Sequence, residues 1–353
     1  MIADALKLSV YFGDSLTAGP LLASDALMAC FADHRLATAT LLRGIEGFGI
    51  NRRIQAERFP DISTDLPLLA VAVDARERIR AVLDDVDRAV PRGLVTLEHT
   101  HLATGDEVRE AEFPAGPGNA AKLTISCAAG ERAGRRPAYR AAVAALRDCG
   151  ASGATVLPGV DGLLHGTRRR ARLFSANAAT PLAIISVGRH DRLRAALPRL
   201  VELLREPTVT LERITQLEHG GALPSLPASI AAPSVWQAIQ VFARRTDQVN
   251  GRTLHSELLR CLREAGAAGA TTILGDWGFG ARDERPYGDR LGRVMSHRPT
   301  CTVYVDRPGN VEEIWPLLDD LIAARGIVTS QFIPGYRERS GETVHGSLDA
   351  SQL

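Results

Sequence analysis

The sequence predicts an α+β protein made of three tandem units, each with the element order βαββαβ. The first observation behind this prediction is a recurring phrase, which reads ATLLRGIEGFG at 39–49, ATVLPGVDGLL at 154–164 and ATTILGDWGFG at 270–280. The second is even spacing, because Gly44, Gly159 and Gly275 hold the same place in the three phrases, 115 and then 116 residues apart. Repetition at a fixed period is the sequence signature of a repeat architecture.

Three further landmarks recur in the same order in every copy. An alternating apolar phrase opens each copy, a proline with an apolar run follows the glycine phrase, and a short Val-Thr phrase closes the copy. In the same order, these landmarks are LKLSVYFG (6–13), AKLTISCA (121–128) and WQAIQVFA (236–243); DLPLLAVAVD (65–74), ATPLAIISVG (179–188) and HRPTCTVYVD (297–306); GLVTLE (93–98), PTVTLE (207–212) and GIVTSQ (326–331). We infer that the chain contains a triplicated unit.

The first copy shows how each element is predicted. Alternation over 7–12 indicates a strand, and apolar residues at helical spacing over 21–36 indicate an amphipathic helix. The elements that follow are a strand over 39–44, a long polar loop, an apolar strand over 66–74, an amphipathic helix over 75–90 and a strand over 94–98. This order is the ferredoxin-like unit, in which two helices cover one face of four antiparallel strands.

The joints between copies are rich in Pro, Gly and polar residues, as linkers are. The last residues have little to bury, so we expect them to be disordered. The predicted boundaries are repeat 1 at 1–103, a linker at 104–118, repeat 2 at 119–216, a linker at 217–233, repeat 3 at 234–337 and a disordered tail at 338–353.

Two prolines disturb the predicted second helices. Pro198 and Pro316 lie at equivalent places in copies 2 and 3, where Asp84 stands in copy 1. Because a proline in a helix interior removes a hydrogen bond, each of these helices is expected either to begin late or to kink.

The composition is typical of a soluble globular protein, with 45% hydrophobic and 24% charged residues among 353. A net charge of +1 provides no field for a nucleic-acid partner. No apolar run reaches the roughly 20 residues of a membrane-spanning helix, and Asp4 and Lys7 interrupt any signal peptide. Five cysteines without disulfide-like spacing suit a reducing environment, so we expect a cytoplasmic protein.

Glycines at the base of the long loop are the main candidates for ligand binding. They permit positive φ and close backbone approach, and such a loop can aim several N–H groups at a phosphate or carboxylate. The alternative is that they only shape a turn. The candidates are Gly44, Gly47 and Gly49 in copy 1 and Gly275, Gly278 and Gly280 in copy 3, together with Phe48 and Phe279, whose rings would stack on a base.

Copy 2 departs from this pattern, because Leu163 and Leu164 replace the Phe and the last Gly. We therefore expect its site to be altered or lost.

Charged residues near the glycines are further candidates. Glu46 and Asp161 share one place in copies 1 and 2, and copy 3 has Asp276 one residue earlier, followed by Trp277. Such a carboxylate accepts from a ribose hydroxyl or binds a cation, or it is an ordinary solvated turn residue. In the loops, Arg52, Arg53 and Arg282 are candidates for phosphate binding, with a solvated loop as the alternative.

Other conspicuous residues are assigned structural roles. Lys7 and Lys122 are interpreted as strand-edge charges, with phosphate contact as the second interpretation. His99 and His101 could form a metal pair, but the pair does not recur, so no metal site is predicted. We also predict no catalytic residue and no enzyme, because no nucleophile elbow, P-loop or carboxylate pair is present.

Cys30 and Cys261 occupy equivalent places on a predicted helix. They are interpreted as small buried hydrophobes, because free cysteine usually behaves as one.

The phrases LKLSVYFG, ATLLRGIEGFG, DLPLLAVAVD and GLVTLE together resemble the family called domain of unknown function 190 (DUF190), which is similar to the PII-like superfamily of trimeric signalling proteins. The resemblance covers nearly all of copy 1, most of copy 3 and a diverged copy 2. It implies ferredoxin-like units around a central axis, with small-molecule sites, often for adenine nucleotides, in clefts between units. It also implies that a long loop reports the ligand state to a partner protein.

Three units in one chain lead us to expect an intramolecular pseudo-trimer that is monomeric in solution. The favoured function is a PII-like regulator that binds a small anionic effector, such as ATP, ADP or another adenine nucleotide, in clefts between repeats. Its partner would be a membrane transporter or ion channel. The alternatives are an adaptor of such a channel that needs no ligand, and a metal-binding trimer resembling the CutA branch of the superfamily.

Overall fold

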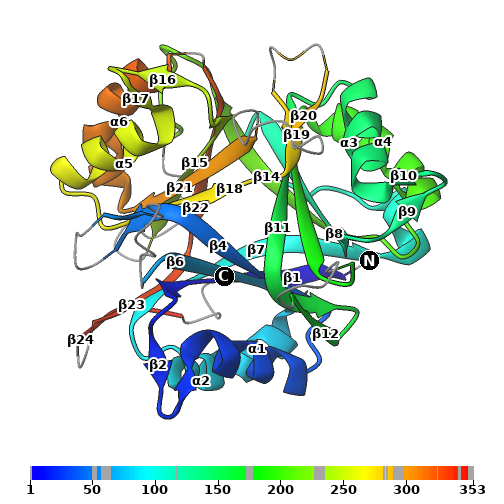
Figure 1. Cartoon of the computed structure of the whole chain (residues 1–353), viewed down its shortest axis with the longest axis horizontal. Helices are drawn as coiled ribbons and strands as arrows, with labels where there is room; N and C mark the ends of the chain where they lie inside the picture. Colours follow the sequence, from blue (N-terminus) through cyan, green and yellow to red (C-terminus); the bar gives the residue numbers. More distant parts are fainter. Residues whose placement is uncertain are drawn as a thin grey trace.

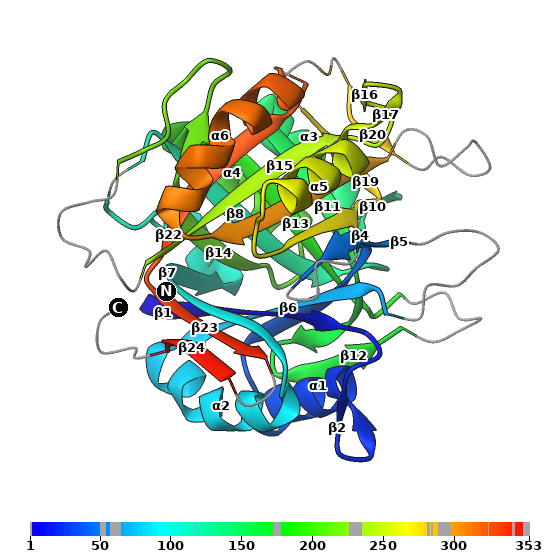
Figure 2. The same ribbon diagram turned by 90° about the vertical axis from the view of Figure 1, so that its left-hand side faces the viewer.

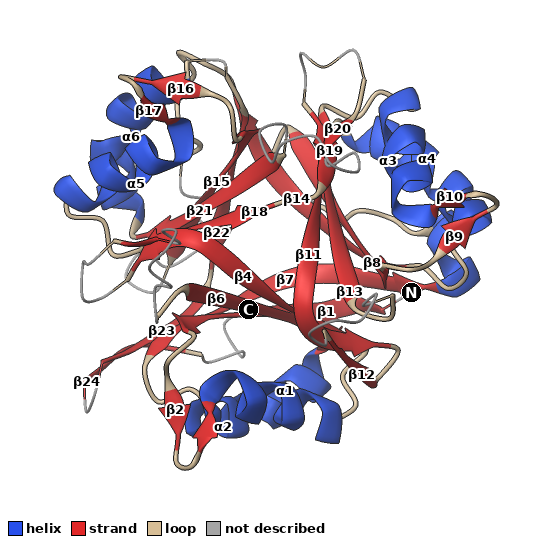
Figure 3. Cartoon of the chain, viewed as in Figure 1, coloured by secondary structure: helices blue, strands red, loops and turns tan. Residues whose placement is uncertain are grey.

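The computed structural model describes residues 2–49, 54–56, 65–116, 118–171, 178–225, 235–280, 283, 285–288, 298–323, 325–340 and 343–348. Within these residues the protein is a mixed α+β structure with a large antiparallel sheet system. The helices lie in three pairs at the outside and the strands fill the middle (Figure 1). Colouring by secondary structure makes this separation plain (Figure 3).

The three repeats contain the same six main elements. In repeat 1 they are β1 (Ile2–Gly13), α1 (Ala23–Asp33), β4 (Thr38–Phe48), β6 (Pro67–Ala75), α2 (Arg76–Ala89) and β7 (Gly93–Thr104). In repeat 2 they are β8 (Ala120–Ala128), α3 (Ala138–Asp148), β11 (Gly153–Leu164), β13 (Pro181–Gly188), α4 (His190–Leu203) and β14 (Thr208–Leu217). In repeat 3 they are β15 (Trp236–Arg244), α5 (Leu254–Glu264), β18 (Ala270–Leu274) with β19 (Trp277–Phe279), β21 (Pro299–Asp306), α6 (Pro308–Ile322) and β22 (Ile327–Ile333).

Short elements decorate this frame. A hairpin made of two strands of two residues each precedes the first helix of each repeat. A further short strand follows the second main strand of each repeat. They are β2 (Thr17–Ala18) with β3 (Leu21–Leu22), β9 (Arg132–Ala133) with β10 (Arg136–Pro137), β16 (Gln248–Val249) with β17 (Arg252–Thr253), and then β5 (Gln55–Ala56), β12 (Thr167–Arg170) and β20 (Tyr287–Gly288).

All three repeats share one strand order, in which the first strand lies between the third and the fourth. In repeat 1 the order is β7–β1–β6–β4, in repeat 2 β14–β8–β13–β11, and in repeat 3 β22–β15–β21–β18, with every neighbouring pair antiparallel. The predicted element order βαββαβ is therefore present three times in the described residues.

Each helix pair covers the outer face of its own strands. In α2, Ile79, Val82 and Val86 recur at helical spacing and are fully buried. They pack with Leu27 and Phe31 of α1 in a core that belongs to repeat 1, and equivalent cores lie under the other two pairs. Burial of each such aliphatic side chain contributes about 1.5–3 kcal/mol, which explains why the amphipathic pattern predicted these helices.

The inner faces of the strands cover one another. One apolar cluster contains Leu42 and Leu69 of repeat 1, Leu157 of repeat 2, and Ile273 and Val303 of repeat 3. This explains why strands such as β6 are apolar on both faces: one side meets helices, and the other meets neighbouring repeats.

Strand pairing joins every repeat to both others. The second main strands pair as β4 with β11, β11 with β19, and β18 with β4. The last strands pair as β7 with β14, β14 with β22, and β23 (Gly335–Ser340) with β7. The three joints thus close a ring, whose crossing strands are seen from the side in Figure 2.

The C-terminal segment differs from the expectation of a disordered tail over 338–353. Strand β23 pairs with β24 (Thr343–Ser347) as a hairpin, and its other edge pairs with residues 93–97 of β7. The expectation is wrong for these residues, because the free edge of β7 supplies backbone partners that the composition of the tail does not reveal.

Two other features concern the prolines and the first linker. Pro198 lies inside α4 and Pro316 inside α6, so these helices do not begin late. The first linker contains a 3₁₀ helix, η1 (Gly105–Glu110), whose Val108 is buried in the core of repeat 2.

Candidate functional site

A cleft of about 150 Å³ lies between repeats 1 and 3. Repeat 1 contributes the end of β1, the end of β4, parts of the segment between β4 and β6, and the start of β7. Repeat 3 contributes the start of β15, β18 and β21, and the hairpin strand β23 that follows it contributes Tyr336 and Glu338. The lining residues that carry the argument are Tyr11, Phe12, Phe48, Gln55, Asp65, Arg92, Trp236, Tyr336 and Glu338.

The wall of the cleft is aromatic. The rings of Trp236 and Tyr336 stack with centroids 3.6 Å apart and an interplanar angle of 17°. The Tyr336 hydroxyl donates to Glu338 Oε2 at 2.7 Å. Burial and this carboxylate raise the pKa of Tyr336 above its usual value, so the hydroxyl remains a donor at physiological pH. Tyr11, Phe12 and Phe48 extend the aromatic lining.

The rim of the cleft is polar. Asp65 accepts hydrogen bonds from Ser15 Oγ and from Gln55 Nε2, each at 2.6 Å. Partial burial would raise the pKa of Asp65, but these hydrogen bonds hold it below its usual value. Arg92 is exposed and supplies a positive charge to the lining.

This combination suits a small planar ligand. An apolar cavity of about this volume accommodates a benzene-sized ring. Ligand sites typically combine apolar walls with a few placed polar groups, here two carboxylates and one guanidinium among the described lining residues.

The equivalent cleft between repeats 3 and 2 is nearly filled, with a volume of about 20 Å³. Ile327 occupies it, and its Cδ1 atom lies 2.3 Å from the place where a Cβ on Gly153 would stand. Tyr287 and Phe242 line the rest. Of the two clefts, only that between repeats 1 and 3 is open enough for a ring.

The six candidate glycines do not use the positive φ that glycine permits. Strand β4 continues through the glycine phrase to Phe48 and pairs with β18 of repeat 3. A Cβ on Gly47 would lie 2.7 Å from the Ala270 carbonyl oxygen, and one on Gly278 would lie 2.4 Å from that of Ala154. The close backbone approach that these glycines permit is therefore an approach to the backbone of a neighbouring repeat.

Gly44 and Gly275 are equally constrained. A Cβ on Gly44 would lie 2.7 Å from Pro67 Cγ, and one on Gly275 would lie 2.8 Å from the Val156 carbonyl oxygen. Gly49 differs, because a Cβ there meets nothing within 4 Å and the residue lines the open cleft. Gly280 lines the filled cleft, and its N–H donates to Asp283 at 2.6 Å.

The two candidate phenylalanines are buried in neighbouring repeats. Phe48 of repeat 1 packs in the core of repeat 3, and Phe279 of repeat 3 packs in the core of repeat 2. Phe48 also lines the open cleft, so it serves both packing and lining.

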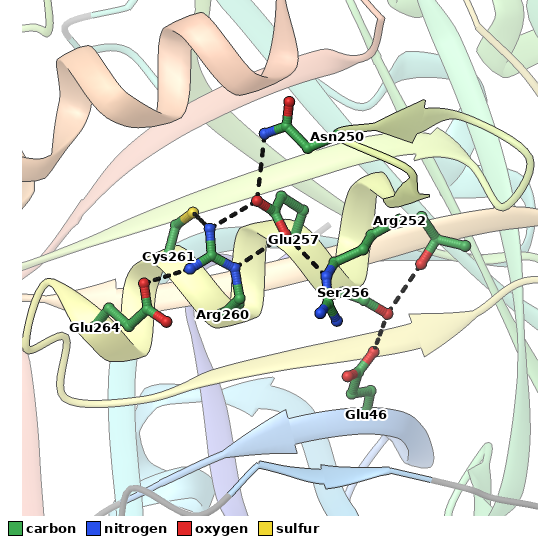
Figure 4. Close-up of polar contacts among 9 residues, drawn as sticks. Glu46, Asn250, Arg252, Ser256, Glu257, Arg260, Cys261 and Glu264 are labelled. Carbon is green, nitrogen blue, oxygen red and sulfur yellow. Dashed lines mark hydrogen bonds and ion pairs between the residues drawn. The ribbon is translucent and has the colours of Figure 1, made fainter.

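The candidate carboxylate Glu46 faces the first helix of repeat 3. Ser256 Oγ donates to Glu46 Oε2 at 2.6 Å (Figure 4). Thr253 Oγ1 donates to Ser256 Oγ at 2.9 Å. His255 Nε2 lies 3.9 Å from the same carboxylate oxygen. Burial, aided by the charge of Arg245, lowers the pKa of His255 to about 4, so this imidazole is neutral at physiological pH.

At the other two junctions between repeats, different side chains surround the residue that is equivalent to Glu46. Asp161 accepts from Arg168 at 2.6 Å, and Arg170 pairs with Asp25 of repeat 1 at 2.7 Å. In the third junction the Arg140 guanidinium lies 4.3 Å from the Trp277 ring centroid. At all three joints, the residue at the place of Glu46 pairs through its backbone with a strand of a neighbouring repeat.

The remaining candidates divide into two groups. Asp276 pairs with Arg298 of its own repeat. Arg52, Arg53 and Arg282 lie outside the described residues.

The lysines interpreted as strand-edge charges are buried near the centre of the molecule. Lys7 Nζ lies 2.9 Å from Glu98 and also pairs with Glu212 of repeat 2, and Lys122 Nζ lies 3.3 Å from Glu212. Lys122 also donates to Gln331 of repeat 3 at 2.9 Å. The strand-edge interpretation is wrong, because contacts between repeats enclose these strand positions.

The charges in this network stabilise one another. Burial alone would raise the pKa of Glu212, but Lys122 and Lys7 hold it below its usual value. Burial would likewise lower the pKa of Lys7, but Glu212 and Glu98 hold it above its usual value. The network links all three repeats and lines a central cavity of about 80 Å³.

The two histidines considered as a metal pair have separate partners. Arg76 Nη2 lies 2.5 Å from His99 Nε2, and His101 Nδ1 lies 2.7 Å from the Glu112 carbonyl oxygen.

Sequence reasoning missed Trp236, Tyr336, Asp65 and Arg92, which lie far apart in the chain. The scarcity of aromatic residues, 5% of the chain, was the available signal. Trp236 and Tyr336 stand at the two ends of repeat 3, where aromatic side chains do not recur in the other copies.

These features define a tandem-repeat α+β protein with an open cleft between its first and last repeats. The chain belongs to the family DUF190, described as uncharacterized ACR, whose family model matches residues 5–102, 120–216 and 236–334. It is similar to a UPF0166 protein of Methanocaldococcus jannaschii, with 23% identity over 90 residues, 26% of this chain and 82% of the relative. That relative is therefore about as long as one repeat.

Among solved structures, a mutant of the ferredoxin protease FusC in complex with Arabidopsis ferredoxin aligns with a TM-score of 0.17 and 10% identity. The alignment covers 92% of this chain and 62% of that chain, and a TM-score this low carries no structural argument. Within the described residues, no helix combines the length and the apolar character needed to cross a membrane.

Proposed function

We propose that this chain is a PII-like regulatory protein whose three ferredoxin-like units form an intramolecular pseudo-trimer. The shared strand order and the ring of strand pairings support this assembly. The relative from Methanocaldococcus jannaschii is about one repeat long. In the proposed assembly, one chain here takes the place of three such units and avoids the entropic cost of association. Light scattering should give a mass near 37.9 kDa; a stable oligomer at micromolar concentration would contradict the proposal.

The proposed effector is an adenine nucleotide bound in the cleft between repeats 1 and 3. The observation that carries this proposal is the aromatic wall formed by Trp236, Tyr336 and Phe48, because aromatic side chains pack well on planar bases. Carboxylates of Asp65 and Glu338 would accept from amino or hydroxyl groups, and Arg92 would pair with a phosphate.

The cleft offers a route from ligand to partner. Gly49, Gln55 and Asp65 belong to the segment between β4 and β6 and also line the cleft. A ligand that competes for Asp65 would break its hydrogen bond with Gln55 and so release these two residues from each other. We propose that a partner protein, such as a membrane transporter or ion channel, reads that change, and that the protein acts by binding rather than by catalysis.

Calorimetric titration of the full chain with ATP, ADP and AMP tests the ligand. We expect binding in the micromolar to millimolar range and at least a tenfold loss of affinity in Arg92→Ala, because a charge-assisted contact is removed. The matched control is Arg325→Ala, since Arg325 is the exposed equivalent of Arg92 and lies two residues before β22. The affinity of this variant should be unchanged.

Two results would contradict this assignment: no binding of any nucleotide at millimolar concentration, or equal losses in the two variants. Capture of a transporter or channel that is insensitive to nucleotide would instead favour the adaptor function.

A further inference from the structure

Three side chains with metal-ligating atoms meet on the outer helices of repeat 1. Cys30 lies in the last turn of α1, His34 is its C-terminal cap, and Asp85 lies on α2. Their ligating atoms all lie within 4.8 Å of one another. His34 Nε2 is 2.8 Å from Asp85 Oδ2.

The backbone explains why the three side chains converge. Cys30 and His34 are four residues apart, so they share one helical face. The packing of α1 against α2 in the core of repeat 1, through Phe31 and Val82 among others, brings Asp85 to the same face.

The donor set matches the chemistry of zinc. Thiolate, imidazole and carboxylate are the three ligand types that Zn²⁺ uses in proteins, and three protein ligands leave one open position. In a tetrahedral site the ligating atoms stand about 3.5 Å apart, as follows from the usual metal–ligand bond lengths. Small side-chain rotations bring atoms within 4.8 Å to that spacing.

The cluster is accessible to an ion from solvent. The side chains of His34 and Asp85 are each 33% exposed, and Cys30 is half-buried. The fourth coordination position therefore has access to water.

We propose that Cys30, His34 and Asp85 bind one divalent transition-metal ion of the zinc type, with solvent as the fourth ligand. Binding releases the Cys30 thiol proton to solvent, and the ion connects the C-terminal end of α1 to α2. The site goes beyond the nucleotide cleft and uses none of its residues.

The other repeats lack this ligand set. The equivalent residues are Ala145, Cys149 and Arg199 in repeat 2 and Cys261, Ala265 and Leu317 in repeat 3. The site is thus specific to repeat 1, and the chain supplies its own control cysteines.

A role without metal is the competing explanation. Asp85 is hydrogen-bonded to His34 and also pairs with Arg88, and these contacts lower the pKa of Asp85. If the cluster exists only to make these contacts of Asp85, the thiol of Cys30 binds no metal.

Titration of the chelator-treated, reduced full chain with Co²⁺ separates the two explanations. We expect one Co²⁺ per chain, a thiolate-to-cobalt charge-transfer band, and displacement of Co²⁺ by one equivalent of Zn²⁺. Cys30→Ser should abolish the band, and His34→Ala should weaken Co²⁺ binding at least tenfold. Cys149→Ser, which alters a half-buried cysteine of repeat 2, should leave both unchanged.

Circular dichroism verifies folding of every variant, and His34→Ala provides the decisive comparison if Cys30→Ser does not fold. The proposal is overturned if the unaltered chain shows no charge-transfer band at millimolar Co²⁺. It is equally overturned if the band survives in folded Cys30→Ser or if neither variant weakens binding.

Discussion

The cleft between repeats 1 and 3 and the cleft between repeats 3 and 2 are built on equivalent strands, yet their volumes are about 150 and 20 Å³. Leu94 and Val303 line the open cleft, whereas Ile327 and Ile185 stand at the equivalent places in the filled one. A repeated backbone therefore does not imply a repeated site, because the shape and placement of a few aliphatic side chains decide whether space remains for a ligand.

The junctions between repeats beside the two clefts also differ, in the side chains that form them. Next to the open cleft, the neutral His255 and Ser256 face Glu46. Next to the filled cleft, Arg140 lies against the Trp277 ring. The first of these two junctions thus contains a buried imidazole that gains a proton between neutral and acidic pH.

The largest expected effect comes from removing the aromatic wall of the open cleft. Trp236→Ala should lower the free energy of unfolding by about 3–5 kcal/mol, because it leaves a cavity against Tyr336. Urea denaturation measures this loss. Trp236→Phe, which keeps an aromatic ring, should lose less than half as much; equal losses would show that stacking with Tyr336 contributes nothing.

Acidification should weaken the junction beside the open cleft. The pKa of His255 falls from 6.5 to about 4 on folding, so its contribution to stability is fully present above pH 6.5 and is lost as the pH falls towards 4. The loss amounts to about 3 kcal/mol, at about 1.4 kcal/mol per pKa unit.

The measurement compares unfolding of the unaltered chain and His255→Gln between pH 7 and pH 4. As the pH falls over this range, the unaltered chain should steadily lose free energy of unfolding relative to His255→Gln. If the two stability curves stay parallel, the buried imidazole does not cause the pH dependence.

Enlarging the filled cleft should make it resemble the open cleft. Ile327→Ala should cost about 2–3 kcal/mol and leave an apolar cavity. Thermal shifts with indole should then show binding that the unaltered filled cleft does not support. Leu94→Ala, at the equivalent place in the open cleft, is the control and should cost less, because Leu94 is only half-buried. The comparison fails if Ile327→Ala gains no affinity for indole.

The smallest expected effect concerns the Tyr336 hydroxyl. Tyr336→Phe keeps the stack on Trp236 and removes the hydrogen bond to Glu338, so it should cost about 1 kcal/mol. Urea denaturation can resolve this loss. A loss of free energy of unfolding as large as that of Trp236→Ala would mean that the hydroxyl, rather than the ring, stabilises the aromatic wall.

Much of the fold could be predicted from local patterns. Apolar residues at helical spacing, such as Ile79, Val82 and Val86, identified α2 because they are buried against their own sheet. The recurring glycine phrase correctly indicated a triplicated unit. Its extension as strand β4 was missed, because the partner strand β18 belongs to a repeat more than 200 residues away.

The candidate site was predicted only in part. Phe48 and Gly49 were named and do line the open cleft, but Trp236, Tyr336, Asp65 and Arg92 were not. No local pattern links these residues, since the ring of strand pairings alone brings them together.

The sequence by itself determined the number of repeats, the order of their elements and the apolar face of each helix, because these depend on the period of side chains along a single element. The tertiary structure decided which cleft stays open, that Lys7 and Lys122 are buried with Glu212, and that Cys30 and His34 meet Asp85. These outcomes depend on side chains from separate elements filling one shared space. The length of each side chain and the closure of the ring, rather than any local periodicity, determine that packing.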